Sequence, residues 1–188
     1  MKKFRKGFTL VELLIVIAVI GSLSAMMMYS SSGAVDSADA SKILSNLQTL
    51  KMAAMQMYMD EPEVASLTKI ALDGSTKVGA KPASGTEDTR ETVAGILGAY
   101  LGKKADALLT STTTGSEHTS KYGLLGNATS WYVVYTFDEK DSSGVKAKLA
   151  AKAEEADIYG TAATTLKVSS FTDYYQNNGE LYIALKVR

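Results

Sequence analysis

The chain of 188 residues has no cysteine and only one histidine, His118. Without cysteine it has no disulfide, no thiol nucleophile and no thiolate metal ligand. A single histidine argues against a histidine-based zinc site or a catalytic triad. Lys plus Arg and Asp plus Glu both number 20, so the formal net charge is zero. This balance gives no argument for a nucleic-acid partner, and it does not exclude one.

Proline is also scarce, and the first of the two prolines is Pro62. The long stretch before it contains an almost unbroken apolar run over residues 8–28, preceded by four basic residues within residues 1–7. About 21 helical residues span roughly 30 Å, the thickness of a bilayer's hydrocarbon core. The basic cluster predicts a cytoplasmic N-terminus, with the rest of the chain on the other side of the membrane. One acid, Glu12, stands inside this run, although a carboxylate in hydrocarbon is costly unless it is paired or neutralised.

Residues 29–61 change to an amphipathic pattern. Apolar residues recur at spacings of three and four, which predicts one buried stripe of a helix: Ile43, Leu44, Leu47, Leu50, Ala54, Met55 and Tyr58. Pro62 disfavours a helical residue before it, so the helix should end near Asp60. A continuous helix from about residue 8 to residue 60 would be nearly 80 Å long. Gly21 and Gly33 weaken it by about 1 kcal/mol each relative to alanine.

Residues 62–188 have the composition of a small mixed head. The patterns predict helices over residues 86–101 and 145–160, strands over residues 130–137 and 181–188, and a polar loop over residues 110–123. Residues 145–149 also suit a strand. Asn177-Asn178-Gly179 is a hairpin signal that predicts pairing of the last strand with residues 167–175. The predicted fold class is α+β: a long N-terminal helix packed on a small antiparallel sheet.

The segment "KGFTLVELLIVIAVIG" closely resembles the class III signal of type IV prepilins and pseudopilins. The basic leader ends at Gly7, Phe8 corresponds to the first mature residue, and Glu12 follows four residues later. Gly21 matches a glycine found in many family members. The motif covers about 20 residues and is specific, because these features must coincide at fixed spacing.

The resemblance implies a leader at residues 1–7, a transmembrane and polymerisation helix at 8–28, an amphipathic continuation at 29–61 and a globular head at 62–188. A prepilin peptidase would cut between Gly7 and Phe8 and N-methylate Phe8. The mature subunit would then leave the membrane at an inner-membrane assembly platform and enter a homo-oligomeric extracellular filament, in which Gly21 gives the helix flexibility. It also implies that the chain is no enzyme and has no catalytic residue, cofactor or metal.

Two ordinary alternatives compete for the N-terminus. A secretory signal would use residues 22–24 as its cleavage site, but the h-region of such a signal seldom contains glutamate. A plain uncleaved anchor is the second alternative. For Glu12 itself, complementing the helix dipole or pairing with its own Phe8 amine are the simpler roles. We favour an intersubunit pair with the Phe8 amine of a neighbouring copy, which would be strong in a dry filament core.

Rival functions remain inside and outside the family. Within it, the chain would be a type II secretion pseudopilin or a minor tip pilin. Outside it, a single-pass anchor would carry a binding or enzymatic head. Acids at Asp36 and Asp39, or at Asp138, Glu139 and Asp141, are candidates for calcium, but the second group has no EF-hand spacing and is interpreted as a solvated turn. The sequence does not choose between adhesion, motility and secretion.

Overall fold

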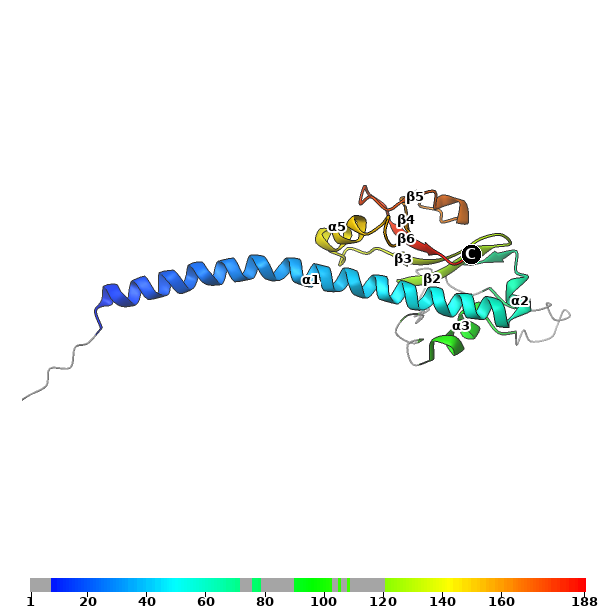
Figure 1. The fold of residues 1–188 in the computed structure, drawn as a ribbon, viewed down its shortest axis with the longest axis horizontal. Helices are drawn as coiled ribbons and strands as arrows, with labels where there is room; N and C mark the ends of the chain where they lie inside the picture. The colour runs from blue at the N-terminus through cyan, green and yellow to red at the C-terminus, as the bar shows by residue number, and fades with distance from the viewer. Residues whose placement is uncertain (1–7, 72–75, 79–89, 103–104, 106–107, 109–120) are drawn as a thin grey trace, which may run out of the picture.

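The structure is a computed structural model that describes residues 8–71, 76–78, 90–102, 105, 108 and 121–188. Its dominant element is helix α1 (Leu10–Asp60), 51 residues long. Figure 1 shows α1 as one continuous rod whose N-terminal part projects from the head. Glu61 ends the helix, and Pro62 opens the short helix α2 (Pro62–Ala65). The predicted uninterrupted helix and its end before Pro62 are therefore confirmed.

The C-terminal half of α1 is buried on one side by the head. Most residues of the predicted stripe are buried. Ala40, Ala53 and Met57, which the stripe did not include, are buried as well. We define the inner side of α1 by its buried residues: Ala40, Ile43, Leu47, Leu50, Ala53, Ala54 and Met57. Met55 was assigned to this stripe wrongly, because it is 37% exposed. At 100° per residue it lies about 120° from the middle of the buried stripe.

Within the described residues, six strands form one antiparallel sheet in the order β1-β2-β3-β6-β4-β5. Their bounds are β1 (Lys69–Ile70), β2 (Tyr122–Asn127), β3 (Trp131–Thr136), β4 (Ile158–Thr161), β5 (Asp173–Tyr174) and β6 (Tyr182–Lys186). The predicted strands around β3 and β6 are confirmed, and these two pair at the centre with Val133 opposite Leu185. One face of the sheet lies on α1 (Figure 1). The other face carries a smaller core of Leu125, Tyr132, Val134, Phe171 and Ala184.

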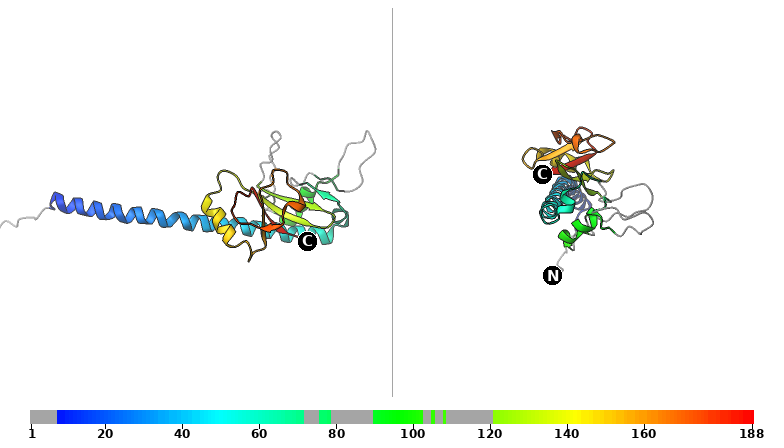
Figure 2. Two further views of the ribbon diagram at one scale, coloured as in Figure 1. Left: turned by 90° about the horizontal axis from the view of Figure 1, so that it is seen from above. Right: turned by 90° about the vertical axis from the view of Figure 1, so that its right-hand side faces the viewer.

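Helix α3 (Val93–Leu101) lies on the side of α1 away from the sheet, as two views agree (Figures 1 and 2). It also contacts α1, so the head packs on α1 from two directions. It was predicted to begin near residue 86, but residues 86–89 lie outside the described part of the chain. Its N-cap is Thr92, whose hydroxyl accepts a hydrogen bond from the backbone N–H of Gly95 at 3.1 Å.

Two predictions for the head are wrong about where strands occur. Residues 110–120 of the predicted loop lie outside the described residues, and its last two residues belong to β2. The predicted helix over residues 145–160 is replaced by α5 (Ser143–Ala151) and, after a series of turns, by β4. Asp157 has a positive φ of 52°, a conformation that no helix continues through. Helix α5 therefore ends early, and Gly160 lies within a strand.

The predicted hairpin between the last strand and residues 167–175 is also wrong. Strand β6 pairs with β3 and β4, while β5 pairs with β4 at the edge of the sheet. The turn signal is real, because Asn177 and Gly179 both have positive φ. However, the carboxylate of Glu180 accepts hydrogen bonds from the backbone N–H groups of Gln176 and Asn178. A side chain thus closes this turn, so the turn does not bring β5 and β6 into register.

Candidate assembly site

The projecting part of α1 is an apolar helix that the rest of the chain does not cover. Residues Leu10–Met27 form a segment long and apolar enough to cross a membrane, and none of it is buried. Leu10 is 78% exposed and Met27 is 78% exposed. Such a surface is far larger than the apolar patches that soluble monomers expose. The segment therefore requires a bilayer or other apolar helices around it.

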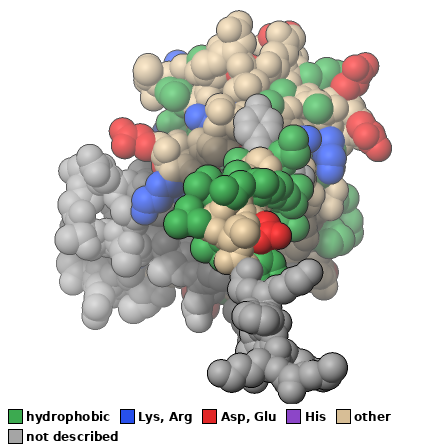
Figure 3. Space-filling view, turned by 90° about the vertical axis from the view of Figure 1, so that its left-hand side faces the viewer, with side chains coloured by type: hydrophobic (Ala, Val, Ile, Leu, Met, Phe, Trp, Pro, Cys, Tyr) green, Lys and Arg blue, Asp and Glu red, His purple; other side chains and the backbone are tan. Residues whose placement is uncertain are grey.

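Glu12 lies in this apolar segment, within the first turn of α1. Figure 3 faces this end of the helix and shows an acidic side chain among hydrophobic ones. The carboxylate of Glu12 accepts hydrogen bonds from the backbone N–H of Thr9 at 2.8 Å and from its hydroxyl at 2.7 Å. The hydroxyl of Thr9 in turn accepts a hydrogen bond from the backbone N–H of Glu12 at 3.2 Å. This reciprocal arrangement is a capping box, which satisfies the free donors at the start of a helix.

Thr9 is the residue of this site that the sequence analysis missed. The pattern Thr-x-x-Glu before an apolar run is the signature of a capping box, so the signal was present. Of the other residues predicted here, Gly7 lies outside the described residues, and Phe8 is 88% exposed beside the cap. Cleavage, methylation and the intersubunit role of Glu12 stay predictions.

Gly21 is helical and lies in the middle of the apolar segment. A Cβ placed on it would meet no heavy atom within 4 Å. The hydroxyls of Ser22 and Ser24 donate to the carbonyls of Val19 and Ile20 at 2.9 and 2.8 Å, which hides their polarity from an apolar environment. The helix runs unbroken through this region, and the flexibility expected at Gly21 stays a prediction.

Hydrogen bonds join α1 to the head at both ends of the part of α1 that packs on the head. Where α1 leaves the head, Asp36 of α1 accepts a hydrogen bond from the hydroxyl of Ser142 at 2.5 Å. Ser142 is the N-cap of α5, where a carboxylate is favoured by the helix dipole. Near the end of α1, the guanidinium of Arg188 donates to the hydroxyl of Tyr58 at 2.6 Å and to the carbonyl of Ala128 at 2.7 Å. The direction of the projecting helix is thereby tied to the head.

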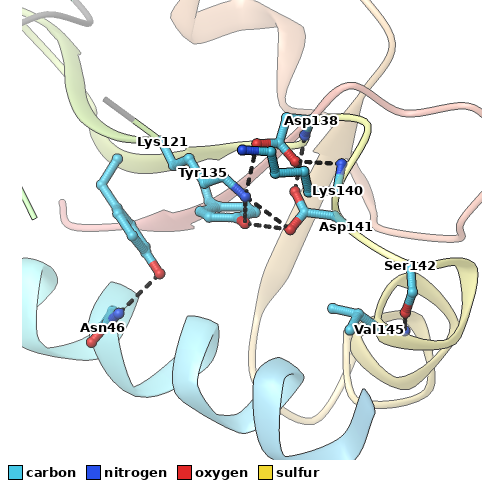
Figure 4. Close-up of polar contacts among 9 residues, drawn as sticks. Asn46, Lys121, Tyr135, Asp138, Lys140, Asp141, Ser142 and Val145 are labelled. Carbon is cyan, nitrogen blue, oxygen red and sulfur yellow. Dashed lines mark hydrogen bonds and ion pairs between the residues drawn. The ribbon is translucent and has the colours of Figure 1, made fainter. Parts of the chain in front are cut away.

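Lys121, Tyr135, Asp138 and Asp141 form a polar cluster between β2, β3 and α5 (Figure 4). The ammonium of Lys121 lies 3.0 Å from Asp138 and 3.1 Å from Asp141. The hydroxyl of Tyr135 donates to Asp141 at 2.9 Å. The same carboxyl group accepts the backbone N–H of Asp138 at 2.9 Å and so closes the turn before α5.

The acids of this cluster are already paired. Asp138 and Asp141, considered above as calcium ligands, both form ion pairs with Lys121. The part of the chain that the structure describes holds no group of three or more acidic or histidine side chains that could bind a metal. A cleft of about 680 Å³ adjoins the cluster, with α1 residues such as Asp39 and Lys42 on one side and Lys121 and Tyr135 on the other. Its mixed charges favour no single class of ligand.

The pairing shifts the ionisation of the cluster. The hydrogen bond from Lys121 lowers the pKa of Asp138 below its usual 3.8. Partial burial acts to lower the pKa of Lys121, but hydrogen bonds to Asp138, Asp141 and Tyr135 outweigh it and raise that pKa above 10.5. Burial, followed by the hydrogen bond to Asp141, raises the pKa of Tyr135. At neutral pH, Lys121 is therefore positively charged, Asp138 is negatively charged and Tyr135 is neutral.

These shifts predict a loss of stability in acid. Asp138 has a lower pKa folded than unfolded, so its stabilising contribution is present above pH 3.8 and disappears as the pH falls through the lower folded value. We expect the urea midpoint of the detergent-solubilised chain to fall more steeply between about pH 5 and pH 2 than that of Asp138→Asn. Equal slopes for the two proteins would contradict the pairing.

The fold and the uncovered helix define a class of protein: a small α+β head with one long helix, whose projecting half is apolar and carries a glutamate in its capped first turn. Comparisons with known proteins point to a family. A family model described as the prokaryotic N-terminal methylation motif matches residues 2–28. The chain is also 32% identical over 89 residues to the type IV major fimbrial protein FimA of Dichelobacter nodosus.

That alignment covers 47% of this chain and 56% of the fimbrial protein, so the chain spans little more than half of that relative's length. No solved structure matches the chain significantly. The methylation motif and the fimbrial relative both agree with the resemblance to type IV pilins. The resemblance found in the sequence is thereby confirmed, and the apolar helix fits membrane anchoring and a place in a surface pilus.

Proposed function

We propose that this chain is the structural subunit of a type IV pilus-like filament, made as a prepilin and assembled through its N-terminal helix. The observation that carries the proposal is the apolar segment Leu10–Met27, which is wholly uncovered in the single chain and holds one acid, Glu12. A bilayer covers such a helix before assembly. A bundle of the same helices covers it afterwards.

Processing supplies the missing partner of Glu12. Cleavage after Gly7 frees the amine of Phe8, which stays cationic after methylation. Glu12 then exchanges its capping bonds with Thr9 for an ion pair with the Phe8 amine of a neighbouring copy. In an apolar core, an unpaired carboxylate is strongly penalised, so the pair sets the relative position of two subunits. The prepilin peptidase and an inner-membrane assembly platform are the partners of these steps.

Topology and the lack of enzymatic chemistry complete the proposal. The basic residues of the leader keep the N-terminus in the cytoplasm before cleavage, and the head lies on the outer side. The head is a scaffold for the filament surface and has no catalytic role. A pseudopilin or a minor tip pilin would share this processing and differ in abundance.

Identifying the first residue of the mature chain is the decisive test of prepilin-type processing. We expect mass spectrometry of the chain, isolated from its native membrane and from sheared surface material, to find methylated Phe8 as the first residue. Electron microscopy of the same sheared material should show abundant filaments made of this chain. Residue 1 or residue 25 as the first residue would reject processing of the prepilin type. Methylated Phe8 without abundant filaments would instead favour the minor pilin or the pseudopilin.

A further inference from the structure

The turn Asn177-Asn178-Gly179 lies between β5 and β6, which do not pair with each other. Figures 1 and 2 show β5 on the side of the head away from α1. All three residues are exposed, and Asn177 and Gly179 have positive φ of 59° and 83°. The carboxylate of Glu180 closes the turn by accepting the backbone N–H groups of Gln176 and Asn178. The turn is thus fixed by one side chain and presented to solvent.

The four asparagines of the chain differ in what holds their side chains. Those of Asn46, Asn127 and Asn177 each form hydrogen bonds with neighbouring groups. The side-chain oxygen of Asn127 alone accepts three of these bonds, at 2.8 to 2.9 Å. The side chain of Asn178 forms no hydrogen bond with any residue that the structure describes. Asn178 is therefore the asparagine whose amide can turn most freely toward the backbone beside it.

Asn178 also differs from the other asparagines in the residue that follows it. It is the only asparagine in the chain that precedes glycine, and glycine has no Cβ to crowd its own backbone nitrogen. The bonds that close the turn come from the N–H groups of Gln176 and Asn178, and the N–H of Gly179 donates to no residue within the described ranges. An unhindered backbone nitrogen thus directly follows a free side-chain amide.

We infer that Asn178 is a site of spontaneous covalent modification, at which the side-chain amide is lost and a carboxylate is formed. In the first step, the backbone nitrogen of Gly179 forms a bond to Cγ of Asn178, and the bond from Cγ to the amide nitrogen breaks. The proton of the Gly179 nitrogen passes to solvent, while the leaving nitrogen takes a proton from water and departs as ammonia. The product is a five-membered succinimide ring.

Water then opens this ring at either of its two carbonyl carbons. Addition at Cγ breaks its bond to the Gly179 nitrogen and gives aspartate, while addition at the backbone carbonyl carbon gives isoaspartate. Neither step needs an oxidant or a reductant. Both products carry a new carboxylate beside Asp173 and Glu180, which line the same cavity of about 310 Å³ as Asn178. Like charges repel, so the modification opposes the closed turn and adds one negative charge to the head.

Ageing of the full chain tests the site directly. The detergent-solubilised chain is incubated in mildly alkaline buffer and sampled over days, and protease digestion with mass spectrometry locates each modified residue. We expect Asn178 to convert at least tenfold faster than Asn177 of the same turn, because only Asn178 precedes an unhindered glycine nitrogen. Both aspartate and isoaspartate should form, since direct hydrolysis gives aspartate alone. Equal rates at the two residues, or aspartate without isoaspartate, would overturn the inference.

A matched variant tests the change of charge. Asn178→Gln keeps an amide at this position, but its longer side chain would have to close a six-membered ring, which forms more slowly. On native isoelectric focusing, the aged unsubstituted chain should acquire an acidic form that Asn178→Gln does not acquire over the same time. The same acidic form in both proteins would contradict the inference. Neither measurement requires filaments, so failure of this inference and failure of the proposed function are distinguished.

Discussion

Replacing Glu12 by alanine is expected to leave the chain inserted in the membrane and to reduce surface filaments to background. Insertion does not suffer, because a charged side chain in a membrane helix costs about 3 kcal/mol and alanine removes that cost. Assembly does suffer, because the cationic Phe8 amine of the neighbouring copy loses its partner in an apolar core. Breaking a buried pair in this way costs about 3–5 kcal/mol at each contact. Immunoblots of membranes and of sheared material measure the two effects separately.

Two further variants separate the charge of Glu12 from its capping role. Glu12→Gln keeps an acceptor for the N–H and hydroxyl of Thr9 and removes the charge, so it should also fail to assemble. Thr9→Val removes the hydroxyl that donates to Glu12 at 2.7 Å and keeps the charge. It should assemble better than Glu12→Gln, because the loss of a cap costs only about 1 kcal/mol. Normal filaments from Glu12→Gln would reject the intersubunit ion pair.

The sequence was sufficient to predict α1, because its signals are long and agree with one another. Apolar content over residues 8–28, the three-and-four spacing beyond it and the stop at Pro62 all describe one helix. Over 51 residues the periodicity averages out local exceptions such as Gly21 and Gly33. The central strand β3 was equally clear, because it is a run of aromatic and β-branched residues.

Short strands were harder to predict, because their local composition is ambiguous. Strand β2 contains Gly123 and Gly126, which weaken a strand pattern. Gly126 is required by packing, since a Cβ there would lie 2.8 Å from the ring of Trp131. Strand β4 follows good helix formers and is separated from them only by the positive φ of Asp157. Which strands become neighbours depends on contacts between distant parts of the chain, such as β3 with β6, and no local turn signal contains them.

The residues of the candidate site also differ in how well the sequence predicts them. Glu12 and Phe8 were identified from local spacing, and the capping role of Thr9 was also readable three residues before Glu12. The bond from Ser142 to Asp36 spans 106 residues and that from Arg188 to Tyr58 spans 130. Such contacts depend on the whole fold and have no signature in one sequence. Only the structure shows that Met52, Met55 and Met59 are exposed while Met57 is buried, because the sides of α1 that the head covers depend on the whole fold.

Substitutions on the buried and the exposed sides of the C-terminal half of α1 should differ strongly in their effect on stability. Leu50 is 1% exposed on the inner side of α1, so Leu50→Ala should lower the free energy of unfolding by about 2–5 kcal/mol through lost contacts and a cavity. Met52, two residues further on and on the other side, should change it by less than about 0.5 kcal/mol when replaced by alanine. Urea unfolding of both variants in mild detergent, followed by the fluorescence of Trp131, measures the difference. Equal destabilisation by the two substitutions would show that the head covers Met52 as well as Leu50.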